Sequence, residues 1–311
     1  MTIHRAQKAQ AHGVTTATIG LAIASTLFFS GCAADAAPAV EATDAAAAAL
    51  LPDDIRDGGV LTVGTFAPSP PTRMYEEDGT TLTGLDIAIV ESIGKSLGLT
   101  VEFSNMKWDG LLPALRSERF NVVAAQVGDF EERRMNGDFV DYFTTGAAAM
   151  GLAAADGDYS DVLDLCGKRV GFQTGVAAAT ALPLLSERCL TERPDAGAMA
   201  LSPFPADAAG LLALRSGQLD IHVMDGTGAT YQASLDQPGE PLAVVIDAVV
   251  ERANIGLVIN KKKPELRDAI ATALETMLTN GEYETILKEY AMEQYGVKAI
   301  TINQTETATG E

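Results

Sequence analysis

The chain has 311 residues and a formal net charge of −20, and its length suffices for two domains of ordinary size. This charge argues against binding to nucleic acid or to an anionic membrane surface, because both would repel the protein. The hydrophobic content of 47% is typical of a globular protein.

Residues 1–31 are typical of a secretion signal. A basic start is followed at residues 19–29 by the apolar run IGLAIASTLFF, which is too short to span a membrane. The signal ends in FSGC, with Cys32 last, and this resembles a bacterial lipobox in which Phe29 replaces the usual leucine. We expect Cys32 to be the lipid-bearing N-terminus of the exported protein. Cleavage near residues 33–37 without lipidation is the alternative.

The segment that follows, residues 32–54, is rich in alanine and dotted with acids. Such a composition offers no obvious core, so we expect a flexible tether between the lipid and a folded body.

From residue 59 onward, segments with strand character alternate with segments of helical periodicity. In the first half, the predicted strands are 59–65, 99–105 and 120–128, and the predicted helices are 84–98 and 108–118, the second capped by Asp109. In the second half, the predicted strands are 168–173, 199–204 and 219–224, and the predicted helices are 174–189, 206–217 and 225–235. The chain ends with strand-like segments at 241–250 and 255–263 and with helices at 264–281 and 282–296. This alternation predicts an α/β fold in which helices cover both faces of parallel sheets.

The sequence offers little for catalysis. After the signal, His222 is the only histidine, and it lies inside an apolar strand, so no metal site or catalytic triad based on imidazole can be assembled. We therefore predict no catalytic residue, no metal and no cofactor. Cys166 and Cys189 are the remaining cysteines, and in an oxidising compartment a disulfide is expected, with two free thiols as the alternative.

Three predicted strand ends carry residues suited to a small zwitterion. Arg133 follows strand 120–128, Asp225 follows strand 219–224, and Thr174 and Gly175 open a helix after the strand 168–173. Ligands of open parallel sheets lie beyond the carboxyl ends of the strands. An arginine can clamp a carboxylate, an aspartate can accept from an ammonium group, and a helix N-terminus favours anions. Two simpler interpretations remain open. Residues 131–134 (EERR) could form a solvated turn, and Asp225 could only cap a helix.

Several motifs, in their order along residues 55–305, resemble the family 3 solute-binding proteins, which are amino-acid-binding receptors of bacterial ABC importers. They include GVLTVGT, WDGLLPALRSERFNVVAAQ, EERRMNGDFVDYF, LCGKRVGFQTG and LRSGQLDIHVMDG. The resemblance implies the two-lobed, type II periplasmic-binding-protein fold, in which each lobe has a mostly parallel sheet flanked by helices. It places two crossover strands near 146–152 and 244–250. Lobe 1 would comprise residues 55–148 and 251–311, and lobe 2 residues 149–250.

The resemblance also assigns roles to single residues. Arg133 matches the arginine that binds the α-carboxylate, with Arg134 as its exposed neighbour, Asp225 matches the acid that binds the α-amino group, and Trp108 matches a wall position. Three positions depart from the family pattern: Gly128 and Val176 stand where hydroxyl side chains are usual, and Thr72 stands where an aromatic residue is common. The full set of predicted ligand-binding residues is Arg133, Asp225, Trp108, Gly128, Gln126, Thr174, Gly175, Val176 and Thr72.

The function that the resemblance implies is that of a substrate-binding lipoprotein of an ABC importer. It would bind an amino acid or a similar zwitterion as a monomer, dock on the permease, and contact the membrane only through its lipid. The cysteine pair resembles that of members from high-GC Gram-positive bacteria, which implies the outer face of the cytoplasmic membrane. An enzyme on the same fold, similar to the dehydratases, and a ligand-sensing partner of a signalling receptor are the alternatives.

Overall fold

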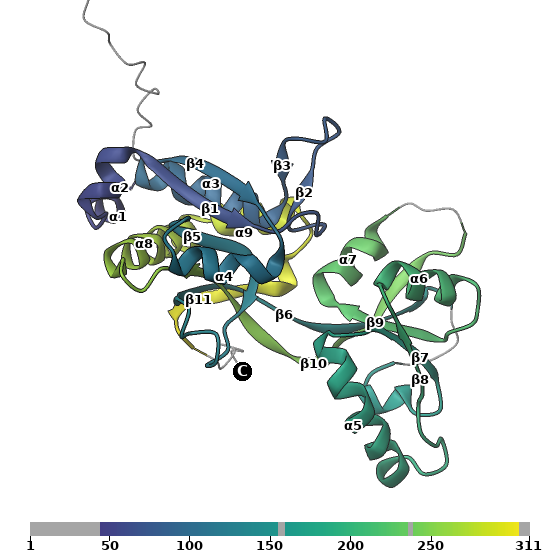
Figure 1. Cartoon of the computed structure of the whole chain (residues 1–311). Helices are drawn as coiled ribbons and strands as arrows, with labels where there is room; N and C mark the ends of the chain where they lie inside the picture. The colour runs from purple at the N-terminus through teal and green to yellow at the C-terminus, as the bar shows by residue number, and fades with distance from the viewer. Residues whose placement is uncertain (1–43, 155–158, 236–238, 305–311) are drawn as a thin grey trace, which may run out of the picture. The chain divides into compact units, whose positions relative to one another are not determined.

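Two sets of three parallel strands lie at either end of one sheet, and two long strands connect them (Figure 1). The computed structural model describes residues 44–154, 159–235 and 239–304, all within one compact unit. The first set is β4 (Thr100–Asn105), β1 (Val60–Thr65) and β5 (Val122–Gly128). The second set is β9 (Ile221–Asp225), β7 (Arg169–Gln173) and β8 (Ala200–Phe204). This arrangement confirms the α/β class predicted from the alternation of strands and helices.

The connecting strands are β6 (Asp138–Leu152) and β10 (Leu242–Ile259), which pair with each other in antiparallel fashion. β10 also pairs with β5, and β6 with β9, so both strands belong to the two ends of the sheet. Their mutual register is irregular between Val244 and Ala253, where β10 has more residues than the opposing stretch of β6. This irregular stretch overlaps the predicted crossovers, whereas the lobe boundaries drawn from the sequence remain a prediction.

Helices cover both faces of the first set of strands. One face carries α3 (Leu85–Leu97), α8 (Pro264–Asn280) and α9 (Glu282–Glu289), and the other carries α4 (Trp108–Arg116). Alternation along β5 explains this, because Val122 and Ala124 point into the larger core while Val123, Ala125 and Val127 pack against α4. α8 begins with Pro264 and ends before Gly281 at φ 84°, as its sequence predicts.

The second set of strands is covered in the same way. Its helices are α5 (Ala177–Glu192), α6 (Asp207–Arg215) and α7 (Gly226–Ser234). Ile221 and Val223 of β9 face a core that includes Leu182 of α5, while Met224 faces a core that includes Leu214 of α6. Cys166 and Cys189 form the expected disulfide, which ties α5 to the 3₁₀ turn η1 (Val162–Leu165).

Smaller elements complete the described structure. They are α1 (Ala45–Ala48), α2 (Asp53–Gly58), β2 (Met74–Tyr75), β3 (Leu82–Thr83), the 3₁₀ turn η2 (Glu293–Tyr295) and β11 (Gly296–Ile302). The helix predicted over 282–296 is therefore shorter, since α9 ends at Glu289. In the described ranges, no helix is long and apolar enough to cross a membrane.

The predicted tether is folded from Asp44 onward, so that prediction is wrong for residues 44–54. Asp44 caps α1 by accepting from the main-chain N–H groups of Ala46 and Ala47, and it also accepts from Thr276 Oγ1 at 2.7 Å. Ala47 and Leu51 are buried in the larger core. Small alanines allow this close approach, which a composition-based interpretation overlooks. The signal sequence and Cys32 lie outside the described residues.

The predicted cap of α4 is also wrong. Lys107 occupies the N-cap position without a side-chain hydrogen bond, and Asp109 lies inside the first turn. There its charge still favours the positive end of the helix dipole.

Candidate ligand-binding site

A cavity of about 470 Å³ is lined by residues from both ends of the sheet. Its polar lining residues are Gln126, Arg133, Thr145, Asp207 and Asp225. Its apolar lining residues include Phe130, Ala147, Val176, Ala178, Met224, Val250, Ala253 and Ile255. Such a mixture of an apolar wall with a few charged groups is typical of sites for small polar molecules.

A neighbouring cavity of about 430 Å³ shares part of this wall. The shared residues are Gln126, Asp207, Met224 and Asp225. The second cavity adds the aromatic side chains of Phe66, Trp108 and Tyr231. The two cavities therefore adjoin each other at the two carboxylates.

Arg133 lies in the turn after β5, between two aromatic rings. Its guanidinium carbon lies 5.0 Å from the ring centre of Phe130 and 6.0 Å from that of Trp108, within the range of cation–π attraction. Nη1 donates to the Gly128 carbonyl at 3.2 Å. Partial burial lowers the pKa of Arg133 from its ordinary value, and the charge of Glu132 opposes this shift. Arg133 has no ion-pair partner within the described part of the chain, so its charge is available to a bound carboxylate.

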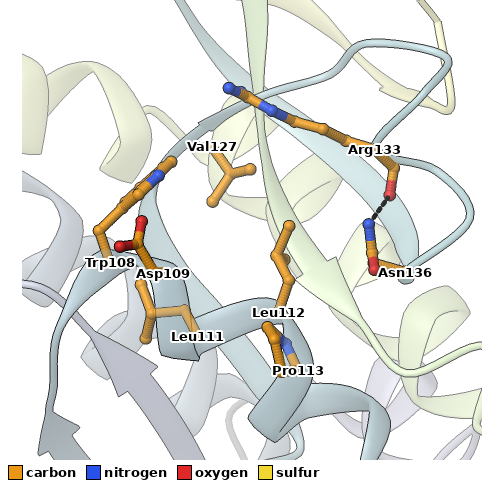
Figure 2. A pocket seen from close by; sticks show the side chains of 8 residues that line it. All are labelled: Trp108, Asp109, Leu111, Leu112, Pro113, Val127, Arg133 and Asn136. Atoms are coloured by element: carbon orange, nitrogen blue, oxygen red, sulfur yellow. Dashed lines mark hydrogen bonds between the residues drawn. The ribbon is translucent and has the colours of Figure 1, made fainter. Parts of the chain in front are cut away.

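Figure 2 shows Trp108 and Arg133 on the wall of a further cavity of about 270 Å³, beside α4. The main chain of Arg133 is held there, because Asn136 Nδ2 donates to its carbonyl oxygen at 3.0 Å. The base of the side chain is thus fixed by the turn itself.

Arg134 has a different role from the one expected. The family resemblance implies an exposed neighbour of Arg133, but Arg134 donates from Nε and Nη2 to the two carboxylate oxygens of Asp129 at 2.7 and 3.0 Å. Asp129 is 1% exposed, and a buried carboxylate requires such a partner. In residues 131–134 (EERR), therefore, Glu131 and Glu132 are exposed, whereas Arg133 and Arg134 are half-buried.

Asp225 caps a helix, as one interpretation of the sequence holds, and its binding of an ammonium group stays a prediction. Its Oδ1 caps α7, accepting from the Thr227 main-chain N–H at 3.0 Å and from Thr227 Oγ1 at 2.6 Å. Its Oδ2 accepts from Thr145 Oγ1 at 3.2 Å. A carboxylate oxygen accepts more than one hydrogen bond, so Oδ2 can also accept from an ammonium group in the cavity.

Gln126 and Gly128 shape the wall near Arg133. Gln126 has a positive φ of 52°, unusual for a residue other than glycine, and its Nε2 is buried without a partner among the described residues. At Gly128, a Cβ would lie 2.7 Å from Phe130 Cε2 and 3.2 Å from Arg133 Nη1. The ring of Phe130 thus occupies the space that a serine or threonine would need.

Of the other predicted binding residues, two line a cavity and three do not. Val176 lines the first cavity as the N-cap of α5, and Trp108 lines the second. Thr72, Thr174 and Gly175 line neither cavity. Thr72 is 1% exposed, and its hydroxyl donates to the Ser69 carbonyl.

Ten of the lining residues of the first cavity were not predicted, and Phe130, Thr145 and Asp207 are among them. Asp207 is the first residue of α6, and its Oδ1 lies 2.9 Å from Nε2 of His222. His222 is fully buried, as its apolar strand predicts. The sequence contains a signal for Asp207, because this acid follows the carboxyl end of the predicted strand 199–204. Among the described residues, no cluster of histidines, cysteines and acids could hold a metal ion.

Comparison with known proteins places the chain in a family. The family model for bacterial extracellular solute-binding proteins, family 3, matches residues 61–293. The protein therefore belongs to this family, as the motifs predict.

The chain is also similar to individual proteins that are named for binding amino acids. The L-cystine-binding protein TcyA of Bacillus subtilis (strain 168) is 38% identical over 114 residues, which are 37% of this chain and 42% of that protein. The arginine-binding protein ArgT of Corynebacterium glutamicum is 26% identical over 258 residues, 82% of each chain. The solved structure of an ancestral cationic amino acid solute-binding protein (AncCDT-1) has a TM-score of 0.62 and 27% identity, covering 76% of this chain and 98% of that one.

Proposed function

We propose that the protein binds an amino acid or a related zwitterion between two lobes and delivers it to the permease of an ABC importer. One observation carries this proposal: the same cavity contains Arg133, which has no ion-pair partner in the described ranges, and Asp225, which can accept a further hydrogen bond. Relatives named for binding cystine and arginine support an amino acid as the ligand.

In this proposal, Arg133 clamps the α-carboxylate and Asp225 accepts from the α-amino group. The ring faces of Phe130 and Trp108 keep the guanidinium in place and shield it from water. Gln126 Nε2, which is buried and unpaired among the described residues, is a further donor for the carboxylate. It would replace part of what the hydroxyls missing at Gly128 and Val176 supply in relatives.

Ligand binding would close the lobes about the two long strands. β6 and β10 pair irregularly between Val244 and Ala253, and an irregular ladder bends more easily than a regular one. We place lobe 1 at residues 55–148 and 251–311 and lobe 2 at 149–250. The closed form would be the one that docks on the permease.

The family is extracellular, and we propose that this protein is exported by its signal and anchored through a lipid on Cys32. The FSGC sequence at residues 29–32 supports this step, and two acyl chains suffice for stable anchoring. Mass spectrometry of the membrane-bound protein tests it, because an N-terminal peptide that starts at an acylated Cys32 is expected.

The binding function is tested by calorimetric titration with the twenty amino acids and with cystine. We expect at least one to bind, and we expect Arg133→Ala and Asp225→Ala each to weaken its binding by about a hundredfold, the effect of losing a charge-assisted hydrogen bond. Arg188→Ala is the matched control, because Arg188 is exposed and paired with Glu192. Unchanged affinity in both site variants would overturn the assignment. Recovery of the ligand unchanged after incubation separates binding from a dehydratase activity.

A further inference from the structure

We propose that the ligand carries a net positive charge, as an amino acid with a basic side chain does, and that Asp207 binds the side-chain cation. This inference rests on the proposed function and deepens it, because it names the class of amino acid.

The charges that line the two adjoining cavities do not balance for a neutral ligand. The first cavity has one cation, Arg133, and two carboxylates, Asp207 and Asp225. The second repeats both carboxylates and adds Arg73. Arg73 is 3% exposed and forms a buried ion pair with Asp86, so this pair adds no net charge. A zwitterion held by Arg133 and Asp225 would leave the carboxylate of Asp207 uncompensated once the site closes, which is costly.

Asp207 is held in a fixed position. Its main-chain N–H donates to Gln173 Oε1 at 3.0 Å, and its Oδ1 lies 2.9 Å from His222 Nε2. The imidazole has little room to move, because a Cβ at Gly210 would lie 2.1 Å from its Cε1 and one at Gly171 would lie 3.1 Å from its Nδ1. A carboxylate fixed in this way is a pre-organised acceptor.

The contact with His222 leaves Asp207 able to bind a cation. Because an ionised carboxylate only accepts hydrogen bonds, His222 donates from Nε2 to Asp207 Oδ1, and the other lone pairs of this carboxylate can accept from a bound cation. The Asp207 side chain is 31% exposed and lines both cavities. Arg215 lies on the same helix and lines a further cavity of about 340 Å³ together with Asp207 and Met224, and its Nη1 donates to the Glu240 carbonyl at 3.0 Å.

The charges of Arg133, Asp207 and Asp225 also argue against cystine as the ligand. Cystine has two carboxylates and two ammonium groups. On the described walls of the two cavities the cations are Arg133 and Arg73, and only Arg133 lacks a carboxylate partner. The second carboxylate of cystine would then face Asp207 without a cation between them. A single basic side chain avoids this repulsion, and its aliphatic stem would pack on Met224, which lines both cavities.

The test uses two pairs of ligands that differ in side-chain charge and little in shape: L-arginine with L-citrulline, and L-lysine with L-norleucine. Calorimetric titration should show that the protein binds the charged member of at least one pair about tenfold or more tightly, the effect of one charge-assisted hydrogen bond. Asp207→Asn should remove this preference by weakening the charged member more than the neutral one, because asparagine still accepts from His222 Nε2 but carries no charge. Asp195→Asn, an equal change of charge at an exposed site, should keep the preference.

The outcomes separate this inference from the proposed function. If neutral amino acids or cystine bind more tightly than arginine and lysine, and that binding depends on Arg133, the inference is wrong and the proposed function stands. If Asp207→Asn weakens both members of a pair equally, Asp207 is structural and the inference is also wrong. If no amino acid or cystine binds, the proposed function itself fails.

Discussion

Arg134 and Asp129 form a two-point ion pair, with Nε and Nη2 of Arg134 at 2.7 and 3.0 Å from the two oxygens of the buried Asp129 carboxylate. This pair ties the turn after β5 to the end of that strand. The adjacent Arg133 makes no such pair in the described part of the chain and lines the cavity instead. The two neighbouring arginines therefore differ in position: Arg134 holds the turn through Asp129, and Arg133 lines the cavity.

Loss of the Arg134–Asp129 pair should destabilise the fold strongly. In Arg134→Ala, the carboxylate of Asp129 stays buried without its cation, and we expect a loss of about 3 kcal/mol in the free energy of unfolding. Urea unfolding at pH 7 measures it. Arg188→Ala breaks the exposed pair with Glu192 and should cost less than about 1 kcal/mol. Equal costs for the two variants would contradict the structural role of Arg134.

Asp141 should make the stability depend on pH in an unusual direction. Burial and the nearby charge of Asp129 raise the pKa of Asp141 to about 7, above the ordinary aspartate value of about 4. Thr301 Oγ1 and the Gln304 N–H donate to its Oδ2, whereas Oδ1 has no partner among the described residues. A proton on Oδ1 can be donated to Asp129, and this hydrogen bond also raises the pKa of Asp141.

The sign of the effect follows from the raised pKa. Between about pH 4 and pH 7, the folded protein binds a proton that the unfolded chain has released. The contribution of this group is therefore fully present below about pH 4, falls as the pH rises, and is lost above about pH 7. In Asp141→Asn the slope should be smaller, by at most about 1.4 kcal/mol per pH unit. Unfolding measured from pH 5 to pH 8 tests this, and identical slopes in the variant and the parent would refute it.

Reduction of the disulfide should lower the stability of the second set of strands. Cys166 and Cys189 are 23 residues apart, and closing such a loop is worth about 3 kcal/mol in the unfolded chain. We expect a lower Tm in the presence of a reductant. A Cys166→Ala, Cys189→Ala double variant should show no further change with the reductant. An unchanged Tm on full reduction of the parent protein would show that the loop entropy is offset elsewhere.

The sequence predicts the layered fold well because hydrophobic alternation depends on local spacing. β5 shows this, since alternate residues face the two cores. The position of Arg133 on the cavity wall could be predicted because it follows a strand end and because the family resemblance distinguishes it from Arg134. The partner of Arg134 could not, because the burial of Asp129 depends on β10, whose Asn254 carbonyl accepts from the Asp129 N–H. Asp207 also follows a predicted strand, but an acid in the first turn of a helix is common for reasons of helix stability alone, so its position did not distinguish it as a cavity residue.

Gly128 should be sensitive to the smallest enlargement, since the Phe130 ring and Arg133 occupy the space beside its Cα. A methyl group there must displace one of them, so we expect Gly128→Ala to weaken ligand binding by about tenfold through movement of Arg133. Phe130→Ala frees the space at the cost of one cation–π contact of about 0.5–1 kcal/mol.

The two changes should therefore be coupled. In the double variant Gly128→Ala, Phe130→Ala, the methyl group fits where the ring was, and the combined loss of affinity should be smaller than the sum of the single losses by about 1 kcal/mol. Titration of all four proteins with the same ligand gives this coupling. Additive losses would mean that the ring of Phe130 moves aside without disturbing Arg133. The crowding by Phe130 would then not be the reason why position 128 is a glycine.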